Sequence, residues 1–216
     1  MESSTPFQNF PKMARFAREC IITEKIDGTN AQIFITEDGD FFTGSRTRWI
    51  TPQDDNFGFS AWAHDHKEEL MLLGPGRHFG EWWGSGIQRG YGLQKGEKRF
   101  SLFNVSRWCL HGETPQPIST AEPRIEKYQD ILPPCCGLVP VLRKGNFDGI
   151  SRMAESALHE LQERGSLAAP GFMKPEGIVI FHTAGNFGFK RTLEKDNQPK
   201  SLSRARITCG PRLYEA

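Results

Sequence analysis

The sequence lacks the features that would assign it at once to a membrane, secreted or strongly charged class. No stretch approaches the ~18 consecutive apolar residues of a membrane-spanning helix, and the opening MESSTPFQNF lacks the basic and apolar segments of a secretory signal. Neither sign of charge dominates, because 27 lysines and arginines almost cancel 26 aspartates and glutamates. A polyanion would therefore have to meet a local basic patch rather than a positive field over the whole molecule. We expect a soluble, cytoplasmic protein that does not bind membranes.

Cysteine patterns and the common phosphate-binding loops are missing too. The five cysteines are an odd number and form no CxxC pair, which fits reduced thiols better than a disulfide framework or a zinc site. Neither GxGxxG nor GxxxxGK[ST] occurs, so a phosphate is not expected on a loop of those kinds.

The hydrophobic pattern of the 216 residues indicates one strand-rich domain with flanking helices. β-Branched or alternating apolar runs predict strands at 20–26, 77–83, 98–108, 177–181 and 186–192, and a hairpin over 30–45 that turns at Asp38-Gly39. Helical spacing predicts one amphipathic helix over 56–73 and another over 151–164. Residues 112–148 are rich in Pro and Gly and show no clear period.

The segment EKIDGTN, residues 24–30, places Lys25 among acidic neighbours where an apolar run meets Gly28. Taken alone, Lys25 would be a surface lysine at a strand end, paired with Glu24 or Asp27. A lysine fixed at such a turn also has a positioned reach, and it becomes a nucleophile as the free amine. Because two carboxylates favour its charged form, this chemistry requires a cation that arrives with the substrate, such as a metal-bound nucleotide.

Six ordered elements along residues 7–196 resemble motifs of the covalent nucleotidyltransferases, the superfamily of DNA ligases, RNA ligases and mRNA capping enzymes. EKIDGTN resembles their KxDG signature, and its leading Glu and trailing Thr-Asn make it most similar to the RNA ligases, especially the nick-sealing second type. The other elements are GSRTR (44–48), HFGEWWGSGIQRGYG (78–92), KRFSLFNV (98–105), PEGIVI (175–180) and FGFKRT (187–192). Six elements in order are far more specific than one heptapeptide.

The resemblance implies an α+β fold, a nucleotidyltransferase core similar to ATP-grasp architecture, in which antiparallel sheets form a nucleotide cleft and helices flank them. Pattern alone reaches only a mixed, strand-rich fold.

The activity that the resemblance implies is that of an ATP-dependent RNA ligase. Lys25 would attack the α-phosphorus of ATP, release pyrophosphate and carry AMP, which passes to a 5′-phosphate end before that end is joined to a 3′-OH. The implied cofactors are ATP and Mg²⁺ or Mn²⁺, and the implied partner is RNA or nucleic acid with RNA ends.

Two carboxylates are implied at the site by their positions in the motifs. Glu176 is matched to a ligand of the divalent cation, and outside its Pro-Glu-Gly context it would be a strand-end acid facing solvent. Glu81 lies on a strand between aromatic neighbours, where a carboxylate needs a partner if those neighbours are buried. By resemblance that partner is the ribose, with a share in metal binding, and the structural alternative is a hydrogen-bonded acid in the fold.

Further residues are matched to nucleotide contacts. Phe103 would stack on the adenine, although strand parity fits an ordinary core position nearly as well. Arg46 is matched to an arginine near the phosphate or the acceptor end, and otherwise it would be a surface residue at a hairpin exit. The remaining matched positions are the backbone groups of Glu24 and Ile26 at the base edge, and Asp27 and Asn30 along the sugar and phosphate.

The last motif departs from the family pattern. RNA ligases commonly have Lys-x-Lys there, whereas FGFKRT has only Lys190, with Arg191 on the opposite face of the expected strand. Lys190 is matched to the α-phosphate contact, where a cation screens the charge of the transition state.

The expected organisation is an adenylyltransferase domain over residues 1–196 and a polar tail over 197–216, with no separate OB domain. Ligases of this superfamily usually add a further domain, so we expect self-adenylylation to be easier to detect than end joining, and end joining to need either an accessory protein or domain in trans or a narrow class of substrate. The alternatives are a DNA ligase, a GTP-dependent capping-type transferase, or a non-catalytic relative that binds nucleotide or nucleic acid.

Overall fold

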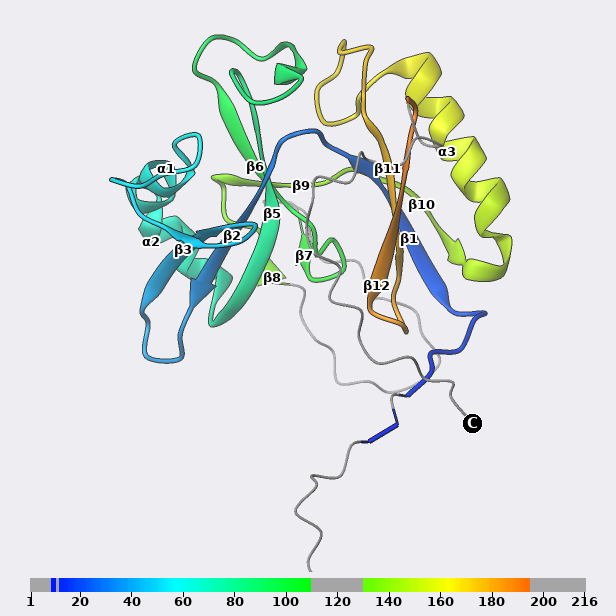
Figure 1. Ribbon diagram of the computed structural model, residues 1–216, viewed down its shortest axis with the longest axis horizontal. Coiled ribbons are helices and arrows are strands. Elements are labelled where there is room, and N and C mark those ends of the chain that lie inside the picture. The colour runs from blue at the N-terminus through cyan, green and yellow to red at the C-terminus, as the bar shows by residue number, and fades with distance from the viewer. Residues whose placement is uncertain (1–8, 11, 110–129, 195–216) are drawn as a thin grey trace, which may run out of the picture.

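The described residues form two main β-sheets that lie beside each other, with helices on their outer sides, and a small two-stranded sheet (Figure 1). The computed structural model describes residues 9–10, 12–109 and 130–194. Figure 1 places α3 outside one sheet and α1 with α2 outside the other, so the inner faces of the two sheets are turned toward each other. Among the described residues, no helix combines the length and the apolar character needed to cross a bilayer.

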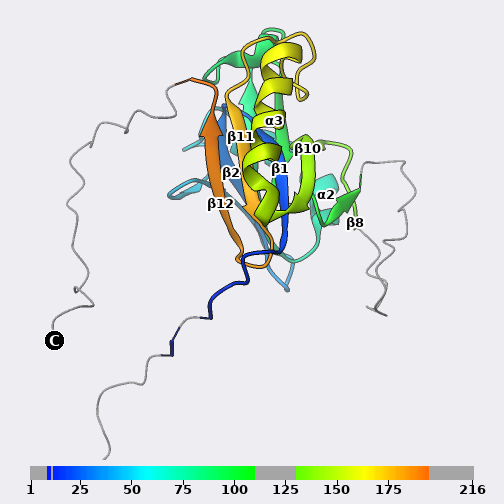
Figure 2. The same ribbon diagram turned by 90° about the vertical axis from the view of Figure 1, so that its right-hand side faces the viewer.

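The first sheet has four antiparallel strands in the order β10, β1, β11, β12. Their bounds are β1 (Glu19–Lys25), β10 (Val141–Asn146), β11 (Gly177–His182) and β12 (Phe187–Thr192). Helix α3 (Ile150–Arg164) lies across this sheet (Figure 2), and Ile22, Ile178 and Leu161 belong to the core between them. Side chains alternate along a strand, so the burial of Ile22 against α3 directs Lys25 to the inner face.

The second sheet has six strands in the order β4, β3, β2, β5, β6, β9, and only the pairing of β6 with β9 is parallel. Their bounds are β2 (Thr29–Ile35), β3 (Phe41–Ser45), β4 (Trp49–Ile50), β5 (Gly76–Gly84), β6 (Lys98–Leu102) and β9 (Cys136–Leu138). The core on its outer face includes Ile33, Phe59, Trp82 and Phe100. The short elements are η2 (Gly90–Gly92), η3 (Phe147–Gly149) and the parallel pair β7 (Trp108–Cys109) and β8 (Asp130–Ile131).

The helix expected over 56–73 is broken. The structure has α1 (Phe59–Asp65), α2 (Lys67–Leu70) and a 3₁₀ turn, η1 (Met71–Leu73), so the prediction of one continuous helix was wrong. The break is at His66, whose φ of −106° and ψ of 20° are not helical. The His66 ring stacks on Trp62 with centroids 4.9 Å apart, and its Nδ1 lies 2.9 Å from the Trp62 carbonyl oxygen.

Two further differences concern strands. The strand expected over 98–108 ends at Leu102, because a turn follows in which Arg107 N donates to Asn104 O at 3.2 Å. Within residues 112–148, which show no clear period in the sequence, the described part contains β8, β9 and β10. The remaining expected strands and the helix over 151–164 are confirmed, and so is the α+β class.

A third apolar cluster joins the two sheets at one end. It contains Ile26, Trp83, Tyr91, Val139 and Ala169. Away from this junction, the inner face of β5 becomes open to solvent: Trp83 is 2% exposed and Glu81 7%, whereas Phe79 is 51% exposed. The inner side of the second sheet is therefore shielded from solvent at the junction and exposed to solvent at its other end.

Candidate active site

Lys25 is the last residue of β1, next to the cluster that joins the two sheets, and it forms an ion pair there. Its Nζ lies 2.6 Å from Oε2 of Glu176, and the side chains are 23% and 18% exposed. Glu176 directly precedes β11, in which Gly177 pairs with Lys25. A side chain at Gly177 would collide with the backbone of Arg191 and Thr192 on β12, so glycine lets three strands approach closely beside Lys25.

Glu24 points away from Lys25 and has a structural role. Its side chain is buried and accepts hydrogen bonds from Ser166 Oγ at 2.5 Å and from the backbone N–H groups of Leu167 and Ala168 at 2.8 and 3.0 Å. Burial raises the pKa of Glu24, and these three donors offset part of that effect. The carboxylate fixes the loop after α3 to the strand that carries Lys25.

The backbone positions expected to read the base edge are held by the fold. Glu24 N donates to Pro140 O at 2.9 Å. Ile26 is buried in the cluster that joins the sheets.

Glu81 lies on the inner face of β5, and both carboxylate oxygens accept hydrogen bonds, one from the turn after Lys25 and one from the start of β2. Gly28 N donates to Oε1 at 3.1 Å, and Asn30 Nδ2 donates to Oε2 at 3.0 Å. Burial raises the pKa of Glu81 to about 7, against the opposing effects of Lys25 and Gly28. Gly28 fits this contact because a Cβ there would lie 2.5 Å from Trp82 O and 3.0 Å from Cγ of Glu81.

Asp27 is held from two sides by residues of the glycine-rich segment. Tyr91 Oη accepts a hydrogen bond from Asp27 N at 2.9 Å, and Arg89 Nε lies 3.0 Å from Asp27 Oδ2. Arg89 Nη1 also donates to the carbonyl oxygen of Lys174 at 3.0 Å, close to Glu176 in the chain. Arg89 thus ties the turn after Lys25 to the segment that leads into Glu176.

Tyr91 is tightly constrained at this position. Its backbone has a φ of 51°, a left-handed conformation that residues other than glycine rarely adopt. Burial raises the pKa of its hydroxyl group. Its ring packs against Phe172, with centroids 4.6 Å apart, and against Trp83 at 5.3 Å. The packing of the ring holds the strained backbone.

Strand register relates Lys190 to Lys25. Lys190 pairs with Val179 on β11, which pairs with Thr23 on β1, and directly opposed residues share one face of a sheet. Lys190 is therefore on the inner face with Lys25, one row further along, and its side chain is exposed. Arg191 pairs with the core residue Ile178 and is on the other face, as the alternation predicts.

Phe103 follows β6 directly and is 42% exposed, so it is not an ordinary core residue. Its N–H donates to Phe79 O at 3.0 Å. The pairing of Glu81 with Ser101 puts Phe79 and Phe103 in the next row of the same face. An exposed aromatic pair thus lies beside Glu81.

Arg46 lies apart from the ion pair. It is in the turn between β3 and β4, is exposed, and forms no hydrogen bond or ion pair with the residues that the structure describes.

In the described ranges, no group of three or more histidine, cysteine, aspartate or glutamate side chains is arranged to hold a metal ion. The carboxylates near Lys25 are Glu176 and Glu81.

Three residues around the site were not found by sequence reasoning: Arg89, Tyr91 and Ser166. Arg89 and Tyr91 belong to the segment 78–92 that was matched to a family motif, but the match assigned them no role. Ser166 lies 142 residues from Glu24, and no local pattern links the two.

Comparisons with known proteins give a family and a fold. A family model described as RNA ligase matches residues 18–195. A search of curated proteins finds no match to the chain.

The similar solved structures include mutants of a Naegleria gruberi RNA ligase. One with ATP and Mn has a TM-score of 0.52 at 19% identity, covering 82% of this chain and 50% of that one. Another, with AMP and Mn, has a TM-score of 0.49 at 20% identity and covers 81% and 49%. The first supports the fold. The chain spans about half the length of these structures.

Proposed function

Because the chain belongs to the RNA ligase family, we propose that it is the adenylyltransferase part of an ATP-dependent RNA ligase, with Lys25 as the nucleophile. The observation that carries this proposal is the 2.6 Å contact between Lys25 and Glu176, formed where β1 ends and β11 begins. We assign the domain to residues 1–196; the tail expected over 197–216 lies outside the described residues.

The proposed reaction has three steps. Lys25 Nζ, as a free amine, attacks the α-phosphorus of ATP; an N–P bond forms, the bond to the bridging oxygen of the β-phosphate breaks, pyrophosphate leaves, and the nitrogen gives up one proton to water. A 5′-phosphate of RNA then attacks the same phosphorus, takes AMP and releases the lysine. Finally a 3′-OH attacks the 5′-phosphorus of the activated end and AMP leaves.

The residues fit a divalent cation that arrives with ATP. The described chain builds no site of three or more ligands, and Mg²⁺ is commonly held by one or two carboxylates together with substrate phosphates. Glu176 would be the main ligand, and Glu81 would use the lone pairs that its two hydrogen bonds leave. The ion would neutralise charge on the phosphates, as it does in other phosphoryl transfers. The ATP and Mn in the Naegleria structure are consistent with this choice of cofactors.

The other matched residues take their proposed roles from their places around Lys25. Phe103 would stack on the adenine, since it is half-exposed beside Glu81. Lys190 would contact the α-phosphate from the same face as Lys25, and Arg46 the phosphate or acceptor end. The backbone of Glu24 and Ile26 would meet the base edge.

Asp27 and Asn30 would border the sugar and phosphate. Both are already held in place, Asp27 by Arg89 and Asn30 by Glu81. A fixed position favours this role, because little entropy is lost when such a residue meets its ligand.

The test is covalent labelling. The full chain is incubated with Mg²⁺ and either α-labelled ATP or α-labelled GTP, and the products are separated under denaturing conditions. We expect a label from ATP, none on Lys25→Ala, and normal labelling of Lys67→Ala, which changes a lysine on the outer helix α2. No label on the wild-type chain, or a label that survives Lys25→Ala, would contradict the proposal. Labelling by GTP alone would favour a capping-type transferase, and nucleotide binding without any label a non-catalytic relative.

End joining is tested separately, because we propose that it needs a partner protein or domain in trans. The adenylylated chain is mixed with RNA and DNA ends. Self-adenylylation is expected to exceed joining by the chain alone. Efficient sealing of a simple nicked duplex by the chain alone would contradict the need for a partner, and sealing of DNA ends alone would favour a DNA ligase.

A further inference from the structure

A group of aromatic side chains continues from Phe79 along the inner face of the six-stranded sheet, away from Lys25. The register puts Phe42, Phe34 and Arg77 in one row across β3, β2 and β5. Trp49 pairs with Gly44 on the same face. We call these five residues, Phe34, Phe42, Trp49, Arg77 and Phe79, the aromatic stripe.

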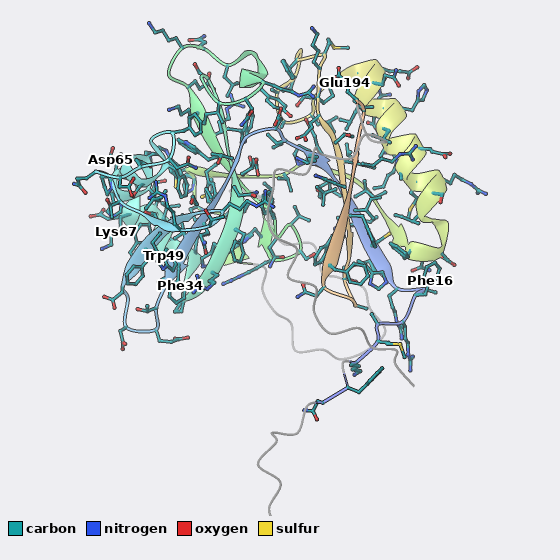
Figure 3. All side chains as sticks on the ribbon, in the orientation of Figure 1. Phe16, Phe34, Trp49, Asp65, Lys67 and Glu194 are labelled. Atoms are coloured by element: carbon teal, nitrogen blue, oxygen red, sulfur yellow. The ribbon has the colours of Figure 1, made fainter. Side chains whose placement is uncertain are left out.

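Three rings of the stripe contact each other, and the Arg77 guanidinium lies over two of them. Phe34 lies 6.1 Å from both Phe42 and Trp49 between centroids, with interplanar angles of 25° and 29°. Figure 3 labels Phe34 and Trp49 close together on the side of the molecule away from α3. The guanidinium of Arg77 lies 4.3 Å from the Phe34 ring centroid and 5.2 Å from that of Trp49.

Arg77 keeps an uncompensated charge in this position. Its Nη1 donates to Gln32 Oε1 at 3.2 Å, and it forms no ion pair within the described part of the chain. An arginine whose guanidinium lies over aromatic rings still has N–H donors that a phosphate can accept. Arg46, in the turn between β3 and β4, adds a second exposed cation next to the stripe.

The stripe is open to solvent although its residues are suited to a core. Phe42 is 43%, Trp49 47% and Phe79 51% exposed, whereas Ile33 and Ile35 on the other face of β2 are buried. A contiguous exposed patch of this kind marks an interaction surface.

The stripe is continuous with the candidate active site. Phe79 lies two residues before Glu81 on β5, and Phe103 N donates to Phe79 O. A chain of nucleotides lying along the stripe would therefore be led to the row of Glu81 and onward to Lys25.

We propose that the aromatic stripe binds unpaired nucleotides of an RNA end, with bases stacked on Trp49, Phe42 and Phe79 and a phosphate held by Arg77. This inference rests on the proposed function, because it names the substrate that reaches Lys25. Aromatic rings alternating with cations are the usual surface for single-stranded nucleic acid. Bases in a duplex already stack on each other and expose no ring face, so the stripe selects unpaired strands.

Acidic residues limit the path of the strand. The turn between β2 and β3 carries Glu37, Asp38 and Asp40, all three beyond Phe34 and Phe42. Because these carboxylates repel phosphate, the strand would leave the stripe over β4, past Arg46, rather than along the hairpin.

The test measures binding of a fluorescently labelled single-stranded RNA to the full chain, in parallel with the same RNA annealed as a nicked duplex. Trp49→Ala and Phe42→Ala are each expected to weaken binding of the single strand about tenfold, the effect of one lost stacked base. Trp49→Phe should keep most of the affinity. The matched control is Phe187→Ala, which removes a ring of similar exposure (45%) from the other sheet. Arg77→Ala should weaken binding and flatten its salt dependence, and Arg152→Ala on α3 should do neither.

Self-adenylylation without RNA separates this inference from the proposed function. Stripe variants are expected to label with ATP as the wild type does, and their melting temperatures to stay close to it. Loss of labelling in the wild type would overturn the proposed function and leave the binding measurement intact. Normal labelling with unchanged RNA binding by the stripe variants would overturn this inference alone. So would an equal loss of single-stranded and duplex binding, or a dimer that Trp49→Ala separates into monomers, because a second copy would then cover the stripe.

Discussion

Lys25 Nζ and Glu176 Oε2 lie 2.6 Å apart across a sequence separation of 151 residues. The pair is partly buried, so Glu176 holds the lysine in a defined place while leaving it accessible. For Lys25 to act as a nucleophile the ion pair has to open, and a cation that takes Glu176 as a ligand would open it. The ion pair with Glu176 would thus keep Lys25 in place, as the unreactive ammonium, until the metal-bound nucleotide arrives.

Glu176→Gln tests this relationship. The amide keeps the shape of the side chain but loses its charge, so we expect the rate of adenylylation to fall on the order of a hundredfold. The free energy of unfolding should change by only about 1 kcal/mol, because the pair is accessible to water. Rapid-quench labelling and chemical denaturation measure the two effects, with Glu97→Gln, an exposed acid paired with Arg99, as the control. Adenylylation of Glu176→Gln at the wild-type rate would show that the carboxylate is not required.

Gly28→Ala should displace Glu81. The added methyl would lie 2.5 Å from Trp82 O and 2.8 Å from Trp83 Cβ, and the backbone atom cannot move aside cheaply. We expect a loss of about 1–3 kcal/mol in the free energy of unfolding and weaker labelling with ATP. Gly149→Ala is the matched control, because a Cβ there meets no atom within 4 Å. Equal stability of the two variants in denaturant would contradict the close packing at Gly28.

Arg89→Ala should loosen the site more than the fold. The variant loses the ion pair with Asp27 and the hydrogen bond to the Lys174 carbonyl, so the turn after Lys25 and the segment before Glu176 are no longer tied. We expect adenylylation to slow by about tenfold or more, since small misplacements of reacting groups are costly. Arg89→Lys should not restore it, because one ammonium group cannot replace the fork of donors. Arg48→Ala, which breaks an exposed pair with Asp54, should leave the rate unchanged, and a similar loss in both variants would argue against a positioning role.

Glu81 should make stability depend on pH. Its pKa is about 7 in the folded chain, against an ordinary value of 4.5. Between these values the folded state binds a proton that the unfolded state does not, so the free energy of unfolding falls as the pH rises through this window, by about 3 kcal/mol. The raised pKa of Glu24 acts in the same direction.

Melting curves from about pH 5 to pH 8 measure this dependence, and Glu81→Gln should reduce its slope. Glu97→Gln is again the control, since that carboxylate is exposed and its pKa is lowered. A slope that is unchanged in Glu81→Gln would mean that Glu81 is already ionised at low pH in the folded chain.

The strands and the order of the motifs could be read from the sequence because they depend on local patterns. The β-branched, apolar runs in 20–26 and 177–181 predict buried strands, and KxDG places Lys25 at a strand end, where the structure has it. The break at His66 could not be predicted, because the apolar spacing continues through it and neither Gly nor Pro marks the position. Strand β10 was not predicted because its sequence, VLRKGN, has apolar residues only at its first two positions, so no apolar alternation marks it.

Contacts between distant segments left no periodic trace. Arg89 meets Asp27 across 62 residues, and Glu24 meets Ser166 across 142, so neither pairing follows from spacing. The aromatic stripe was hidden for another reason. Phe34 and Phe42 lie in strands where apolar residues occupy both faces, and only the burial of Ile33 and Ile35 reveals that the Phe34 face is the open one.

Solvent exposure rises along β5 from Trp83 through Glu81 to Phe79. The screening of charges by salt should rise in the same direction. Mobile counterions reach the outer end freely and weaken every attraction there, while the partly buried pair of Lys25 and Glu176 near the junction is screened less. Added salt should therefore release a polyanion from the outer end well before it alters bond formation at the junction.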